Sequence, residues 1–453
     1  WLGRLLADRP ADRFASAAEA GQSLRELTDP PPALREARAG TRPDPLTTVA
    51  DNFYNTDEAQ LELLANGNLA AVFRSGMFGA PGQNGTTNLR SVLLDQSGAA
   101  QSAVQLVASG DTVTYVSGAT MSSLAAGSLF MAWESGPNEG GPGDGDVYGR
   151  IYTAAGTPLS AAFAVPLDVA NGEFEVDVLA LANGNFLLTW SDLGTSVLPN
   201  LNTEIIGQIF TPAGVRVGGE FQINADSTGL QLGHEVITLT DGRIAAIWQD
   251  VVLVIDPVTG EPTSILGSVM EMRFLTAAGA GTGSDVTVVT AASGFHFSDE
   301  SGAFSTLALA GGGFAILWSE DNSATNPSAA TFHLRLQRFD ANGTAVGSAT
   351  AVQTVTGFDT QSNNDALGTI ELQQLADGSL LAFWMQGSGT STPQQFQPPE
   401  AHVAVVGTTG TVLIGATALD TVPGTFAGDI IAIEVLPNGQ LMALAASNNG
   451  TFL

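Results

Sequence analysis

Residues 181–190 read LANGNFLLTW, and this ten-residue pattern recurs along the chain without gaps. Seven copies begin at a leucine, at Leu64, Leu124, Leu181, Leu239, Leu309, Leu375 and Leu436. Each copy has Gly three residues after the leucine and a large apolar residue two positions further on. The tenth residue is Trp in five copies, Phe in one and Ala in the last. Copies spaced 57–70 residues apart indicate a repeat architecture.

Each copy has the residue pattern of a β-hairpin. Asn-Gly and Asp-Gly tolerate positive φ, and we expect them to form tight primed turns between two strands. The strand after the turn, as in LLTW or AAIW, is apolar on both faces. A strand of that kind is buried on both sides. We expect the Trp at its end to belong to the core and to fill the gap between neighbouring sheets.

A second hairpin follows in most units and has its own glycine turn, at Gly98, Gly156, Gly214, Gly279, Gly343 and Gly410. Two hairpins give four strands per unit, and four-stranded sheets repeated around an axis form a β-propeller. We therefore predict an all-β fold over residues 44–453, a propeller of about seven four-stranded blades. Residues 45–50 (PLTTVA) are a candidate outer strand for the last blade, without which the ring is incomplete.

The composition is strongly acidic. The chain has 45 Asp and Glu against 15 basic residues, all of them Arg, for a formal net charge of −30. Such a surface repels phosphate, so nucleic acid is not expected as a partner, and it attracts cations such as Ca²⁺. There is no cysteine and no run of 18 apolar residues, so we expect neither a disulfide nor a membrane span.

Residues 1–43 differ from the rest and are predicted to form a helical segment and a Pro-rich linker. The run LLADRPADRFASAAEAGQSL (5–24) resembles the C-terminal end of a bacterial Ser/Thr protein kinase domain. That resemblance implies a structural ion pair for Arg13. The glycine loop and the catalytic motifs of a kinase are not in this sequence, so it is not expected to transfer phosphate by itself.

The repeats, best seen in residues 183–224 and 307–353, resemble those of bacterial RTX-type calcium-dependent secreted and surface proteins. The shared pattern is a Leu-Ala-(Asn/Asp)-Gly hairpin ending in Trp, a polar loop, and a second hairpin ending in Phe-x-(Val/Ile)-Asn. The resemblance implies secretion or surface attachment, often adhesion. The calcium-binding nonapeptide is not present as an array, although GGPGDGDVY (140–148) comes close.

Two loops are candidate calcium sites. Asp144 and Asp146 form an Asp-x-Asp in a glycine-rich loop, and carboxylates two residues apart on a turn converge on one hard cation. Glu320 and Asp321 occupy the equivalent loop of a later unit. The alternative interpretation is that both are solvated acidic loops. The four histidines share no repeat position and no metal-binding spacing.

A further set of polar residues stands seven positions before each turn glycine: Gln60, Thr120, Asp177, Glu235, Ser305, Glu371 and Ala432. If the first strand of each hairpin faces the propeller axis, then Asp177, Glu235 and Glu371 form a ring at the channel. Such a ring binds cations or supplies paired acids for glycoside cleavage. Ordinary polarity of the blade surface is the preferred alternative.

The main functional interpretation is a non-catalytic secreted or cell-surface module, stabilised by calcium, that binds a glycan or protein through its inter-strand loops. Repetition without a distinct catalytic cluster favours it. One alternative is the sensor region of a bacterial Ser/Thr protein kinase whose catalytic lobe precedes this chain, which would place it in the cytoplasm. A further alternative is a propeller glycoside hydrolase that uses the channel carboxylates.

Overall fold

The computed structural model describes most of the repeat region and is all-β. The described residues are 59–77, 86–110, 115–124, 127–136, 145–167, 172–193, 202–255, 262–297, 304–326, 328–358, 367–386, 400–419 and 428–447. Among them there are 27 strands and no helix. No helix in these ranges is therefore long and apolar enough to cross a membrane. The predicted helical segment and the candidate strand at 45–50 lie outside the described residues.

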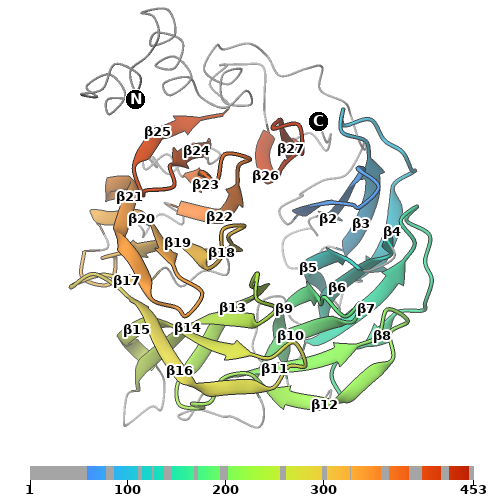
Figure 1. Ribbon diagram of the computed structural model, residues 1–453, viewed down its shortest axis with the longest axis horizontal. Helices are drawn as coiled ribbons and strands as arrows, with labels where there is room; N and C mark the ends of the chain where they lie inside the picture. Colours follow the sequence, from blue (N-terminus) through green and yellow to red (C-terminus); the bar gives the residue numbers. More distant parts are fainter. Residues whose placement is uncertain are drawn as a thin grey trace, which may run out of the picture.

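The strands form antiparallel sheets arranged around one axis as a β-propeller (Figure 1). Blades 1 to 3 contain β1 (Ala59–Leu63), β2 (Leu69–Met77), β3 (Thr86–Leu94) and β4 (Gln105–Ser109); β5 (Tyr115–Ser123), β6 (Leu129–Gly136), β7 (Asp146–Tyr152) and β8 (Phe163–Ala164); and β9 (Glu173–Ala180), β10 (Phe186–Asp192), β11 (Glu204–Phe210) and β12 (Arg216–Gln222). Blades 4 to 6 contain β13 (Leu230–Thr238), β14 (Ile244–Ile255), β15 (Pro262–Leu275) and β16 (Gly281–Thr290); β17 (His296–Phe297), β18 (Phe304–Ala308), β19 (Phe314–Asp321), β20 (Ala330–Phe339) and β21 (Ala345–Phe358); and β22 (Leu367–Gln374), β23 (Leu380–Gln386), β24 (Glu400–Val406) and β25 (Val412–Ala418).

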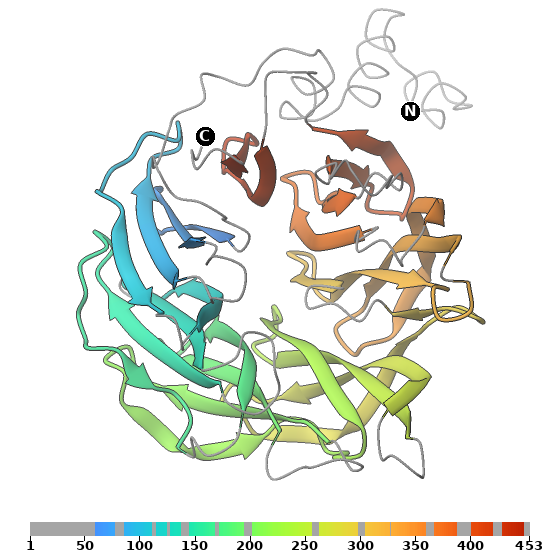
Figure 2. The ribbon, with the colours of Figure 1, turned by 180° about the vertical axis from the view of Figure 1, so that it is seen from behind.

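The prediction of a propeller is confirmed, with a correction to the number of blades. Among the described residues, six sheets have four or five strands, and the seventh repeat forms a two-stranded sheet, β26 (Gly428–Val435) with β27 (Leu441–Ser447). We call this pair half-blade 7. It lies between blade 6 and blade 1 when the ring is seen from either side (Figures 1 and 2).

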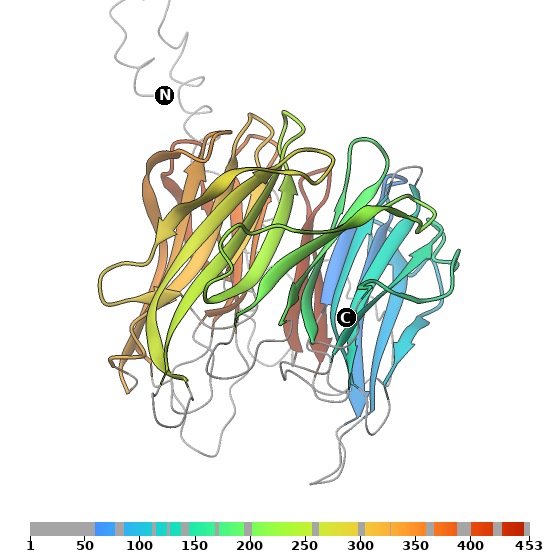
Figure 3. The ribbon, with the colours of Figure 1, turned by 90° about the horizontal axis from the view of Figure 1, so that it is seen from below.

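The glycine turns differ in type from the expected primed turns. In the hairpin at 64–68, Gly67 donates its N–H to the Leu64 carbonyl oxygen at 2.8 Å and has φ 84°, while Asn66 keeps a negative φ. This geometry is a type I turn followed by a left-handed glycine. The Asn66 side chain accepts the Asn68 N–H at 3.0 Å, which explains why Asn or Asp precedes the glycine in most copies. These turns gather at one end of the disc (Figure 3).

Each blade packs against the next through its own apolar cluster. The described core divides into seven clusters, and each joins the facing sides of two neighbouring sheets around the whole ring. The repeated Trp lies in the cluster shared with the preceding blade: Trp248 of blade 4 packs with Ile205 and Ile223 of blade 3. Phe73 does the same between half-blade 7 and blade 1, so this half-blade closes the ring.

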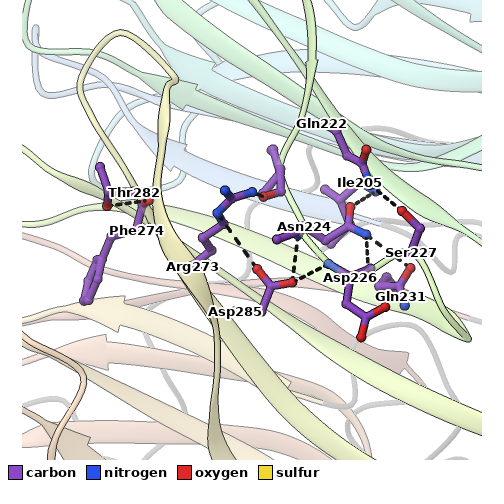
Figure 4. A network of polar contacts seen from close by, with 12 residues as sticks. Ile205, Gln222, Asn224, Asp226, Ser227, Gln231, Arg273, Phe274, Thr282 and Asp285 are labelled. Carbon is purple, nitrogen blue, oxygen red and sulfur yellow. Dashed lines mark hydrogen bonds and ion pairs between the residues drawn. The ribbon is translucent and has the colours of Figure 1, made fainter.

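A polar network fastens the crossing from blade 3 to blade 4 (Figure 4). The Asp285 carboxylate accepts the Ala225 and Asp226 N–H groups at 2.7 and 2.8 Å. Arg273 donates from Nη1 to the Ile223 carbonyl oxygen at 2.8 Å, and its Nε lies 3.9 Å from Asp285 Oδ1. Asn224, the last residue of the Phe-x-Ile-Asn pattern, is buried and accepts the Ile205 N–H at 2.9 Å. The asparagine of the repeat pattern therefore holds the backbone in place at the crossing from blade 3 to blade 4.

We expect Asp285→Ala to lower the free energy of unfolding by about 2 kcal/mol, because two backbone N–H groups then lose their acceptor and the Arg273 guanidinium loses its nearby countercharge. Urea unfolding followed by fluorescence measures this change. The control is Thr282→Ala on the same strand, where the exposed hydroxyl bonds only the Phe274 carbonyl, and its expected cost is under about 0.5 kcal/mol. If the two variants were equally stable, the polar network around Asp285 would not stabilise the crossing from blade 3 to blade 4.

Candidate functional site: the axial carboxyl groups

The strands nearest the axis carry the residues predicted to ring the channel. We call β1, β5, β9, β13, β18, β22 and β26 the axial strands, because each is the innermost strand of its sheet (Figure 1). Asp177 lies on β9, Glu235 on β13 and Glu371 on β22, at equivalent positions in blades 3, 4 and 6. All three side chains are partly exposed. The structure thus brings them to one level around the axis.

The axial carboxyl groups form hydrogen bonds with the backbone of the next blade. Asp177 Oδ2 accepts the Val236 N–H of the next blade at 3.1 Å, and Glu235 Oε2 accepts the Thr306 N–H of the following blade at 2.5 Å. Glu371 bonds the Ile433 N–H in the same way. An innermost strand has no further strand to pair its axial N–H groups, so these groups need other acceptors. The carboxyl groups therefore join neighbouring blades.

Two acidic residues of the same ring were missed in the sequence. Glu62 of β1 and Glu434 of β26 stand five positions before their turn glycines, two residues beyond the level that we compared. Side chains two residues apart on a strand share a face, and this alternation was the signal available. Glu62 Oε1 accepts the Ser123 N–H of blade 2 at 3.0 Å. Burial raises the pKa of Glu62, and it raises that of Glu434 to about 8.

Burial near the axis makes the carboxyl groups of Asp177, Glu235 and Glu371 hard to ionise. Burial raises the pKa of Asp177 to about 6 and that of Glu371 to about 7. Burial also raises the pKa of Glu235 to about 8, with the negative charges of Asp177 and Glu371 adding to the effect and the bonds from Thr306 opposing it. At pH 7 Glu235 is therefore mostly protonated and its neighbour Asp177 mostly ionised. An acid and a base stand on adjacent axial strands.

Thr306 holds the Glu235 carboxyl group in place. Its backbone N–H and its hydroxyl Oγ1 both donate to Glu235 Oε2, at 2.5 and 2.6 Å. Among the hydrogen bonds of the described residues, none involves Glu235 Oε1. The arrangement fixes one carboxyl oxygen and leaves the other to carry and release a proton.

A second set of acids lies where the axial strands begin. Asp146 lies close to the carboxyl group of the buried Glu173. Tyr148 donates to Asp146 at 3.3 Å, and burial raises the pKa of Asp146. Asp144, the other residue of the predicted calcium loop, lies outside the described residues. The structure thus places Asp146 beside a carboxyl group that the sequence analysis had not singled out.

Glu175 adopts a strained backbone near these acids. Its φ is 54°, in the left-handed region that non-glycine residues rarely adopt, at a bulge where β9 shifts register against β10. Its N–H donates to Glu134 Oε1 of blade 2 at 2.6 Å, and its Oε2 accepts the Gly233 N–H of blade 4 at 2.8 Å. Glu175 therefore links three consecutive blades.

His234 is buried beside the same bulge. Its ring nitrogens lie 2.9 Å from Thr189 Oγ1 and 3.3 Å from Ser191 Oγ, both on blade 3. Burial lowers its pKa to about 4, so the ring is neutral at pH 7. This histidine could not be selected from the sequence, because its spacing does not indicate that two hydroxyl groups of blade 3 lie next to it.

Glu320 and Asp321 are engaged by neighbouring protein groups. Glu320 pairs with Arg335 through Oε1, and its Oε2 accepts the Ala292 N–H at 3.1 Å. Asp321 Oδ1 accepts the Ser323 N–H at 2.8 Å and lies 3.3 Å from His296 Nε2. Within the described ranges, no group of three or more His, Asp or Glu side chains is arranged to hold a metal ion. Calcium binding stays a prediction.

Comparison with known proteins finds distant structural likeness and no family. No family model matches the chain, and no curated protein matches it. Solved structures do resemble it: a protein of unknown function from Dyadobacter fermentans has 12% identity over 80% of this chain and 98% of its own, with a TM-score of 0.49. An α-L-arabinofuranosidase of Fusarium graminearum has 11% identity over 80% and 98%, with a TM-score of 0.44. A sialidase of Streptococcus pneumoniae has 10% identity over 92% and 70%, with a TM-score of 0.43.

These comparisons correct the main functional interpretation. We expected a non-catalytic, calcium-stabilised binding or adhesion module, whereas the similar structures whose descriptions state an activity are glycoside hydrolases. The adhesion interpretation is therefore corrected in favour of the hydrolase alternative. At 10 to 13% identity and with TM-scores below 0.5, the likeness carries no activity over to this chain, so its activity has to be argued from its own residues.

Proposed function

We propose that this chain is a glycoside hydrolase whose chemistry takes place at the axial carboxyl groups Asp177 and Glu235. The observation that carries the proposal is the placement of these two carboxyl groups at equivalent positions on adjacent axial strands, where burial raises their pKa values to about 6 and about 8. Two carboxyl groups whose environments separate their pKa values can act as an acid and a base in one site.

Hydrolysis of a glycosidic bond needs one carboxylic acid and one carboxylate. In the proposed reaction, the protonated Glu235 gives its proton to the oxygen of the leaving sugar as the bond to the anomeric carbon breaks. The ionised Asp177 stabilises the positive charge that develops on the sugar ring, or it removes a proton from the water that attacks the anomeric carbon. Thr306 bonds Glu235 Oε2, so Oε1 is the oxygen that carries the transferred proton in this proposal.

Glu371 is the third axial acid of the proposed site. Its pKa of about 7 leaves it half ionised at neutral pH, and its charge raises the pKa of Glu235. Glu371 therefore helps to keep the proposed general acid protonated. Secretion or surface attachment, and a kinase lobe before Trp1, stay predictions, and residues 1–43 lie outside the described part of the chain.

The test is a panel of aryl glycosides and plant and bacterial polysaccharides, with release of reducing sugar as the readout. We expect Glu235→Gln to lower kcat about a hundredfold or more and to remove the loss of activity near pH 8. The matched control is Asp241→Asn, an exposed hairpin residue for which other copies use Asn. A wild-type protein that is inactive on the whole panel, or a fully active Glu235→Gln variant, would refute the proposal.

A further inference from the structure

A pocket of about 530 Å³ lies between the first hairpin turns of blades 5 and 6. Pockets of this size accept small ligands. It lies at the end of the disc where the tight turns gather, beyond the last residues of the axial strands β18 and β22. Its polar lining comes from Arg338, Gln374, Thr408 and the backbone of Gly311 and Gly312.

Arg338 is the charged group of this pocket, and it is poorly partnered. Its Nη2 makes two long hydrogen bonds, to the Gly378 carbonyl oxygen at 3.3 Å and the Gly407 carbonyl oxygen at 3.5 Å. Its Nε is buried without a hydrogen-bond acceptor in the described structure. The Nε atoms of Arg216 and Arg273 are buried in the same way, but Arg273, like Arg243 and Arg335, lies within 4 Å of a carboxylate. Among the described residues no carboxylate pairs with Arg216, and its Nη2 instead donates to the Val165 carbonyl oxygen at 2.7 Å. In a chain with three acidic residues for each Arg, an unneutralised guanidinium in a pocket calls for an explanation.

We infer that this pocket binds a small oxyanion, such as a carboxylate or a sulfate group, through the Arg338 guanidinium. A guanidinium presents its N–H donors as a planar fork that matches two oxygens of one anion. Partly burying an unpaired charge is unfavourable, and burial lowers the pKa of Arg338. A bound anion would supply the missing countercharge through the terminal nitrogens of the guanidinium.

The neighbouring groups suit such a ligand. Gln374 Oε1 accepts the Ala310 N–H at 2.9 Å, which orients its amide so that Nε2 points toward the Gly378 side of the pocket. Thr408 also lines the pocket. A Cβ added at Gly311 would meet no atom within 4 Å, so there is open space on that side of the lining. The pocket therefore offers one fixed charge, an oriented amide group and room for a few heavy atoms.

The test is isothermal titration calorimetry with sodium acetate and with sodium sulfate, at constant ionic strength set by sodium chloride. We expect saturable millimolar binding of at least one of the two anions, and the stronger one identifies the class. Arg338→Gln should weaken that binding about tenfold or more, the loss expected when one charge-assisted hydrogen bond is removed.

Gly311→Phe tests the same site without touching the charge. Its ring is expected to fill the pocket and weaken binding about tenfold or more, whereas Gly219→Phe is the control, because a Cβ there also meets nothing within 4 Å but lies on β12 of blade 3. No saturable binding to the wild type, or unchanged binding in both Arg338→Gln and Gly311→Phe, would overturn the inference. These titrations use no glycoside, so their outcome is independent of the proposed hydrolase activity.

Discussion

Trp248→Ala is expected to lower the free energy of unfolding by about 4 kcal/mol. Trp248 is fully buried and fills the cluster between blades 3 and 4, where it packs with Ile205, Ile223 and Leu275. Removal of its indole leaves a cavity that two rigid sheets cannot close, and the cost of lost burial adds to the cost of the cavity. Chemical denaturation of the two proteins measures the difference.

The chain itself provides the control for this substitution. Phe73 occupies the equivalent position in blade 1 and is equally buried. Trp248→Phe should therefore cost roughly half as much as Trp248→Ala, since the aromatic ring keeps most of the contact. If Trp248→Ala left stability within about 0.5 kcal/mol of the wild type, the idea that neighbouring blades share one core at this position would be wrong.

Raising the pH from about 5 to about 9 is expected to destabilise the fold by several kcal/mol, because carboxyl groups whose pKa values are raised in the folded state cost free energy when they ionise there. Asp177, Glu235, Glu371 and Glu434 all have folded-state pKa values above their usual ones, at about 6, 8, 7 and 8. The folded state thus binds protons more tightly than the unfolded state. The stability contributed by these groups is complete below about pH 4 and is lost as the pH rises through 6 to 8.

Thermal unfolding at a series of pH values checks this prediction. The net charge of −30 also favours unfolding at high pH through self-repulsion, so the wild-type curve alone does not isolate the axial groups. The double variant Glu235→Gln, Glu371→Gln should show a distinctly smaller fall in melting temperature between pH 6 and 9. A melting temperature that stays constant or rises over this range in the wild type would contradict the raised pKa values.

The repeat pattern predicted most of the fold because each of its residues has one structural task. The leucine and the large apolar residue of each hairpin fall in the inter-blade clusters, as Leu239 and Ile244 do on either side of Gly242. The glycine has a positive φ in all seven copies. These roles depend on local backbone geometry and on burial between blades. Because every unit needs the same residues for them, the same residue types recur in every unit of the sequence.

The site was predicted less completely, for physical reasons. Asp177, Glu235 and Glu371 were found because they share a repeat position, but their bonds to the next blade depend on the stagger between sheets, which sequence spacing does not report. The link from Glu134 to Glu175 joins two blades at a bulge that has no sequence signature. The turn type was wrong because Asn-Gly suits both primed turns and a type I turn with a left-handed glycine.

Glu235 provides the most direct test of the account. Its side-chain carboxyl can be followed by ¹³C NMR in protein labelled at the glutamate δ-carbon, with Glu235→Gln to assign the signal. We predict a carboxyl that is still largely protonated at pH 7 and titrates near pH 8. A Glu235 signal that is fully ionised at pH 6 would remove the proton donor from the axis, and with it the proposed hydrolytic site.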